Sequence, residues 1–151
     1  EALIYAAARS AHVNDKILPW LRDGAVVISD RFLDSSLAYQ GAGRGLGLET
    51  VSAINAPAVR GLKPDLTIVL TMPVADSRAR QGERGTSDRI EAESDEFHGT
   101  LMEEFERIAE LDPQRYLVID ARASIEDIAQ QIYAAVSPLL GGVPRSAGEN
   151  A

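Results

Sequence analysis

The chain contains no cysteine and few aromatic residues. The absence of cysteine excludes disulfide bonds, thiolate metal sites and a cysteine nucleophile. Aromatic residues make up only 5% of the chain, so we expect Val, Ile, Leu and Ala to form the core. Hydrophobic residues still reach 45% and charged residues 25%, which is typical of a folded globular protein. The length of 151 residues corresponds to one domain.

Basic residues are outnumbered by acidic ones. The chain has 15 Lys and Arg residues against 23 Asp and Glu residues, and its formal net charge is −8. Such a chain has no overall attraction to nucleic acid or to anionic membranes, so neither is expected as a partner. No apolar run approaches the roughly 20 residues that span a bilayer, and no signal peptide opens the sequence. We therefore expect a cytoplasmic protein.

Helix and strand patterns alternate along the chain. Helical spacing of apolar residues predicts helices over 2–21, 48–60, 73–81, 91–111 and 124–140. Short apolar runs predict buried strands over 25–29, 66–70 and 116–119. Pro19 predicts a kink, and Gly24 predicts a left-handed helix end. The alternation indicates a three-layer α/β fold with a parallel sheet, in which ligands bind at the carboxyl ends of the strands.

Two segments are expected to lack regular structure. Residues 82–89 are polar and contain two glycines, which predicts a flexible loop. Residues 141–151 are expected to form a disordered tail, leaving 1–140 as the domain. Between them, Ser124 and Asp127 resemble a capping box at the start of the last helix.

The first candidate site follows the strand predicted over 25–29. The carboxylate of Asp30 could orient Mg²⁺ or its water ligands, and the guanidinium of Arg31 could hold a phosphate through two hydrogen bonds. An ordinary surface pair is the commoner reading of the dipeptide taken alone. Its position at the carboxyl end of a strand favours the functional interpretation.

Polar residues follow this pair closely. Ser35, Ser36 and Gln40 could read a base edge, and Tyr39 could pack against a sugar. A capped short helix with Tyr39 in the core explains the same pattern equally well. On the first predicted helix, Tyr5 lies four residues from Arg9, so both share one face. Together they could stack on a base and donate to its carbonyl, although a core tyrosine beside a surface arginine is the simpler alternative.

Arginines gather around the predicted loop. The set comprises Arg78, Arg80, Arg84 and Arg89. A mobile, arginine-rich loop can close over a transferring phosphoryl group and neutralise its charge. A solvated run of charges is the commoner explanation. The glycines at 41, 43, 45 and 47 do not match a phosphate-binding motif and indicate a hinge or a connection. His12 and His98 have no metal-ligand spacing.

Taken together, these segments resemble the thymidylate kinase family. The resemblance rests on 1–9, 27–45, 62–67, 88–91 and 118–121, and it covers the chain to about residue 140. The stretch 30–45, Asp-Arg-Phe-Leu-Asp-Ser-Ser-Leu-Ala-Tyr-Gln-Gly-Ala-Gly-Arg-Gly, is the most specific part. The resemblance implies a P-loop kinase-like fold, with ATP as co-substrate, Mg²⁺ as cofactor, dTMP as phosphoryl acceptor and a homodimer as the assembly.

The resemblance also implies residue roles. Tyr5 would stack on thymine, and Arg9 would donate to the thymine carbonyl. Arg31 would hold the dTMP phosphate, with Asp30 near the magnesium ion. Tyr39 would crowd the sugar and disfavour a 2′-hydroxyl. The remaining contacts would come from Ser35, Ser36 and Gln40 along the nucleotide, and from the lid arginines Arg80 or Arg84 at the transferred phosphoryl group.

The chain departs from the family pattern in three places. Thr71 stands where the strand often carries Asp, and the lid spacing differs. The third departure is larger: residues 1–151 contain no Gly-x-x-x-x-Gly-Lys-Ser/Thr loop, and neither the strand before that loop nor the segment after it is present. We therefore expect a sheet without its first strand, which belongs between 25–29 and 66–70. We also expect an N-terminally incomplete kinase that is inactive alone. The alternatives are a non-catalytic remnant, a dTMP-binding module, or another nucleoside monophosphate kinase.

Overall fold

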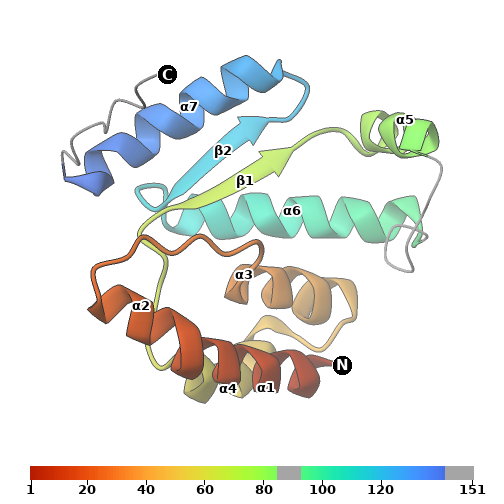
Figure 1. Ribbon diagram of the computed structural model, residues 1–151. Coiled ribbons are helices and arrows are strands. Elements are labelled where there is room, and N and C mark those ends of the chain that lie inside the picture. The colour runs from red at the N-terminus through yellow and green to blue at the C-terminus, as the bar shows by residue number, and fades with distance from the viewer. Residues whose placement is uncertain (85–92, 142–151) are drawn as a thin grey trace, which may run out of the picture.

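A computed structural model describes residues 1–84 and 93–141, with side chains described for 1–80 and 93–141 (Figure 1). The first half is helical and comprises α1 (Ala2–His12), η1 (Val13–Ile17), α2 (Leu18–Arg22), α3 (Leu33–Ser36), η2 (Leu37–Gly43) and α4 (Leu48–Val59). The second half comprises β1 (Thr67–Thr71), α5 (Val74–Arg84), α6 (Asp95–Leu111), β2 (Tyr116–Asp120), α7 (Ile125–Val136) and η3 (Ser137–Leu140). The helices η1 and η2 are π-helices, and η3 is a 3₁₀-helix.

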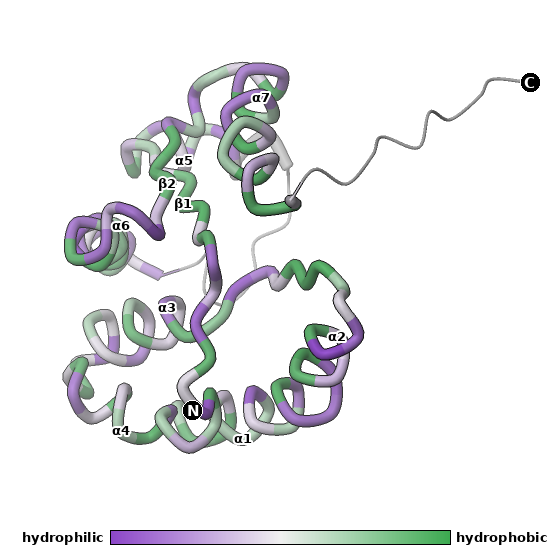
Figure 2. Tube along the Cα trace, turned by 90° about the vertical axis from the view of Figure 1, so that its left-hand side faces the viewer, coloured by the Kyte–Doolittle hydropathy of each residue, from purple (hydrophilic) through white to green (hydrophobic). Residues whose placement is uncertain are grey.

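The sheet is two-stranded and parallel among the described residues. β1 pairs with β2 from Thr67 opposite Tyr116 to Thr71 opposite Asp120. Helices α6 and α7 lie on opposite sides of this sheet in both views (Figures 1 and 2). A core cluster of Val69, Ile108, Ala109 and Tyr116 joins the sheet to α6. This helix–sheet–helix arrangement is the layering that the alternating pattern predicts.

A separate group of helices packs below α6. Helices α1 and α4 are in contact, and η2 contacts both α4 and α6 (Figure 1). Val13 and Val51 are fully buried within this group. The helix predicted over 2–21 extends to Arg22, and its five π-helical residues precede Pro19. Gly24 ends it with a φ of 78°, as predicted.

The strand predicted over 25–29 is wrong. These residues form no strand, and β1 and β2 are the only strands in the described part of the chain. The side chains of Val26 and Ile28 are 64% and 92% exposed. A strand requires a hydrogen-bonding neighbour, and an apolar run without one remains an irregular segment whose side chains face solvent.

The loop predicted over 82–89 is wrong at its start, because α5 continues through Arg84. The rest of that loop, and the predicted tail beyond residue 141, lie outside the described residues. The Ser124 cap is confirmed, since its Oγ accepts from the Asp127 N–H at 3.0 Å and donates to the Asp127 carboxylate at 2.7 Å. None of the helices in the described ranges has the length and apolar character that crossing a membrane requires.

Candidate functional site

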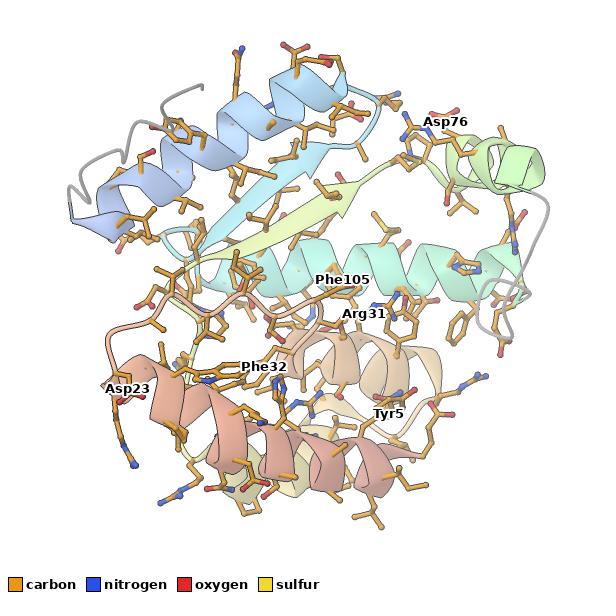
Figure 3. The ribbon with its side chains drawn as sticks, in the orientation of Figure 1. Tyr5, Asp23, Arg31, Phe32, Asp76 and Phe105 are labelled. Carbon is orange, nitrogen blue, oxygen red and sulfur yellow. The ribbon has the colours of Figure 1, made fainter. Side chains whose placement is uncertain are left out.

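A cavity of about 320 Å³ lies between α1 and the chain that runs from residue 30 into η2. Figure 3 labels three of its residues, Tyr5 on α1 and Arg31 and Phe32 before α3. The cavity is lined by Tyr5, Ala8, Arg9, His12, Asp30, Arg31, Phe32, Ser35, Ser36, Tyr39 and Gln40. The structure thus gathers all the residues singled out on the first helix and over 30–40 into one place.

Arg9 ties three segments together at the cavity wall. Its Nη2 donates to the Phe32 carbonyl at 2.9 Å and to the Ser36 hydroxyl at 2.8 Å. Its Nη1 donates to the side-chain carbonyl of Asn55 on α4. Burial lowers the pKa of the Arg9 guanidinium, and the nearby Asp34 carboxylate acts in the opposite direction. Arginine stays protonated in proteins, so a fixed positive charge faces the cavity.

Arg31 adopts a backbone conformation that L-residues rarely use. Its φ is 71°, in the left-handed region, where the Cβ of a non-glycine residue crowds the backbone. Its guanidinium carbon lies 5.1 Å from the centre of the Tyr39 ring, within the range of a cation–π contact. Strained residues cluster at functional sites, so this geometry marks Arg31 as a candidate ligand-binding residue.

Tyr39 and Gln40 enter the cavity from a π-helix. The turn of this helix is wider than an α-helical turn, since the Arg44 N–H donates to the Tyr39 carbonyl five residues earlier at 2.9 Å. Gln40 is 4% exposed, and its Nε2 donates to the Glu1 carboxylate at 2.8 Å. Single π-helical turns occur frequently at functional sites, where they change the direction of side chains.

Aromatic side chains of α6 pack against the Tyr39 ring. Its ring meets those of Phe97 and Phe105 on α6 edge to face, with centroids 6.3 and 6.4 Å apart. Gly43 permits this packing, because a Cβ at that position would lie 2.7 Å from Phe97 Cε2. Gly41 and Gly43 are closely packed within η2, whereas Gly45 and Gly47 lie in the connection between η2 and α4.

Of the four arginines expected around the lid, the two with described side chains, Arg78 and Arg80, do not line this cavity. Arg80 lies on α5 with an exposed side chain, Arg84 ends α5 with its side chain undescribed, and Arg89 lies outside the described residues. Arg78 donates from Nε to the Asp95 carboxylate at 2.8 Å. That ion pair gives Arg78 a structural partner at the start of α6.

A second cavity, of about 390 Å³, lies at the carboxyl ends of β1 and β2. It is lined by Thr71, Met72, Pro73, Val74, Gly99, Met102, Glu103, Glu106, Asp120 and Arg122. Arg122 donates to the Asp120 carboxylate through two side-chain hydrogen bonds of 2.6 and 3.0 Å and through its backbone N–H at 2.9 Å. These hydrogen bonds lower the pKa of the Asp120 carboxyl to about 2.

The described residues offer little for a metal ion. They contain no group of three or more His, Cys, Asp or Glu side chains that could hold one. Asp30 lines the first cavity beside Arg31. Mg²⁺ is commonly bound through one or two carboxylates together with water and substrate phosphates, so a single carboxylate at this position fits that ion.

Some residues of this site were missed by the sequence analysis. Ala8 and His12 lie on the same side of the first helix as Arg9, so helical periodicity could have found them. Phe32 follows Arg31, and its carbonyl accepts from Arg9. Asn55 is fully buried in α4, and nothing in the local sequence indicates its contact with Arg9.

Known proteins match almost the whole chain. The thymidylate kinase family profile covers residues 1–132. Proteins named thymidylate kinase from Enterococcus faecalis and Lactobacillus helveticus are each 46% identical, over 138 and 142 residues, covering 90% and 93% of this chain. A thymidylate kinase from Synechococcus is 46% identical over 148 residues, or 96% of the chain. The aligned parts make up 65%, 67% and 70% of these three relatives, so the chain spans about two thirds of their length. On the family profile and these identities, the chain belongs to the thymidylate kinase family.

Proposed function

We propose that the protein transfers a phosphoryl group from ATP to dTMP, giving dTDP for dTTP synthesis. The observation that carries this proposal is the first cavity, where two tyrosines, two arginines and several neutral hydrogen-bonding groups meet. Its volume of about 320 Å³ lies at the lower end of the range for small-molecule sites. The names of the matching relatives agree with this substrate.

In this proposal the base of dTMP lies at the α1 side of the cavity. Tyr5, 45% exposed, offers its ring for stacking on thymine, and Arg9 donates to a thymine carbonyl. Ser35 lines the same cavity, and Ser36 acts through its hydrogen bond with Arg9. Such a site distinguishes a pyrimidine by the shape of the base and by the base carbonyl to which Arg9 donates.

The phosphate of dTMP lies at Arg31, whose guanidinium can make two charge-assisted hydrogen bonds. Tyr39 stacks beneath that guanidinium and limits the space beside the sugar. Gln40, held by Glu1, completes this wall along the nucleotide. The strained backbone of Arg31 supports the role, because strain of this kind persists where a side chain must point in one direction.

Transfer would proceed in line, without a covalent intermediate, so positioning and charge neutralisation supply the catalysis. Asp30 would hold Mg²⁺, which neutralises charge on the phosphate oxygens when bound. Arg80 or Arg84, both on α5, would approach the transferred group and neutralise its charge.

We further propose that the irregular segment 25–29 joins the sheet when a strand lies between it and β1. Exposed Val26 and Ile28, together with Leu70 on β1 at 52% exposure, are the apolar side chains that such a strand would cover. The phosphate-binding loop expected for ATP would follow that strand. We accordingly propose negligible turnover for residues 1–151 alone.

The homodimer implied by the resemblance is also a proposal. Leu3 and Ile4 on α1 are 71% and 74% exposed and would be covered by a second copy. Analytical ultracentrifugation of the purified chain checks the assembly, and a monomer at all concentrations would contradict a dimer.

The proposed function is tested by calorimetric titration of the protein with dTMP, with UMP as the matched control. Selective binding of dTMP supports the acceptor site. Binding that is equal for both nucleotides, or absent for both, contradicts it. A coupled assay for ADP formation tests turnover, and robust dTMP-dependent activity of residues 1–151 would overturn the proposal that they are inactive alone.

A further inference from the structure

The side chain of Asn55 occupies an unusual place for a polar residue. It lies in the interior of α4 with no exposed surface, although asparagine is a poor helix former. Burying an amide is costly unless its polar atoms are hydrogen-bonded. Its Nδ2 donates to the Val51 carbonyl at 2.8 Å, and its Oδ1 accepts from Nη1 of Arg9. The hydrogen bond that the Asn55 Oδ1 accepts thus comes from Arg9.

The guanidinium of Arg9 donates three hydrogen bonds within the protein. Its acceptors are Asn55 on α4, the Phe32 carbonyl before α3 and the Ser36 hydroxyl at the end of α3. These bonds use three of the five N–H groups of an arginine. Among the described residues, the Nε–H and one Nη1–H of Arg9 have no acceptor, while the side chain lines the first cavity.

Both bonds from Nη2 lead to residues 32–36, so they alone would let the guanidinium turn about that nitrogen. The third bond is donated by Nη1 to Asn55, which lies on a different helix. This bond therefore fixes the remaining rotation of the guanidinium. The ring of Phe32, 5.7 Å from the guanidinium carbon, limits movement on one face. A donor that is already oriented loses less freedom when it binds a ligand.

We propose that Asn55 is a positioning residue for pyrimidine recognition, holding Arg9 so that one of its two remaining N–H groups faces a carbonyl of the bound base. This inference rests on the proposed binding of dTMP. It adds to the site a residue that never touches the nucleotide and that acts through Arg9 alone.

The test compares two replacements of Asn55. Asn55→Leu removes the acceptor and should weaken dTMP binding about tenfold, the effect of one charge-assisted hydrogen bond. Asn55→Asp is the matched control, since it retains an acceptor for Arg9 while it loses the donor to Val51 and adds a negative charge beside the guanidinium. It should bind dTMP within about threefold of the unchanged protein. Equal loss in both variants would overturn the proposal, because the Val51 bond or general packing would then be responsible.

A double-mutant cycle separates positioning from structural support. In an Arg9→Ala background, Asn55→Leu should change dTMP affinity by less than about twofold, since there is no guanidinium left to position. Thermal unfolding of each variant records any loss of stability separately. If Asn55→Leu weakens binding tenfold in both backgrounds, Asn55 supports the pocket generally and does not act through Arg9.

A spectroscopic measurement tests the positioning without any nucleotide. In ¹⁵N-labelled protein, the Arg9 side-chain signals, assigned by their loss in Arg9→Lys, should show slow rotation of the guanidinium. Asn55→Leu should make that rotation fast, and Asn55→Asp should not. Failure of the unchanged protein to bind dTMP would count against the proposed function, whereas equally fast rotation in all three proteins would refute the positioning role itself.

Discussion

The backbone of Arg31 allows stability and ligand affinity to be separated by one pair of substitutions. At a φ of 71°, a residue with a Cβ is destabilised by roughly 1–2 kcal/mol relative to its relaxed conformation. Arg31→Ala retains that Cβ and loses the contact with Tyr39, worth about 0.5–1 kcal/mol at an exposed position. Arg31→Gly loses the same contact but removes the strain, while the greater freedom of the unfolded glycine opposes it by about 0.5–1 kcal/mol.

The glycine variant should therefore be about 1 kcal/mol more stable than the alanine variant, which corresponds to a rise of about 2–4 °C in Tm for a chain of this size. Both variants lack the guanidinium, so both should lose on the order of 1.5–3 kcal/mol of dTMP binding. Thermal unfolding and calorimetric titration of the two proteins provide the comparison. Equal Tm values would refute the strain at Arg31, and unaltered affinity in both would refute its phosphate-binding role.

Two further predictions concern packing and pH. Gly43→Ala places a methyl group 2.7 Å from Phe97 Cε2 and should destabilise the protein by about 1–3 kcal/mol in urea unfolding. Gly99→Ala, whose added methyl group would meet no atom within 4 Å outside its own stretch of helix, should instead be neutral or stabilising by up to about 1 kcal/mol. The Asp120 carboxyl has a pKa of about 2, below its ordinary value of 3.8, so its stabilising contribution is present above about pH 4 and is lost as the pH falls towards 2. Arg122→Ala should return that pKa towards 3.8 in a ¹³C NMR titration, and an unchanged midpoint would show that Arg122 is not the cause.

Features that depend on neighbouring residues could be predicted from the sequence. The first helix, its end at Gly24 and the cap formed by Ser124 and Asp127 each follow from local spacing and local hydrogen bonds. The strand predicted over 25–29 could not be judged in this way. Its apolar pattern is typical of a buried strand, but a strand forms only against a partner, and that partner is not specified by residues 25–29 themselves.

The same distinction applies to the first cavity. Tyr5 and Arg9 are brought together by the period of one helix, which the sequence displays directly. The bond between Arg9 and Asn55 joins residues 46 positions apart, and no spacing rule indicates it. The positive φ of Arg31 is likewise a result of tertiary packing, because its sequence gives no reason to expect a left-handed residue.

The π-helix at Leu37–Gly43 makes the cavity sensitive to the number of residues in that segment. Deleting one residue there would allow the chain to return to α-helical bonding, in which each residue advances by about 100° around the axis. Because a π-helical turn takes up about one residue more than an α-helical turn, the two changes would largely cancel. Side chains beyond the deletion would keep their directions relative to Ser36, and only those at the deletion would shift. A one-residue gap at this segment in an otherwise similar sequence would therefore indicate loss of the π-helix and a local change in the cavity wall at Tyr39 and Gln40.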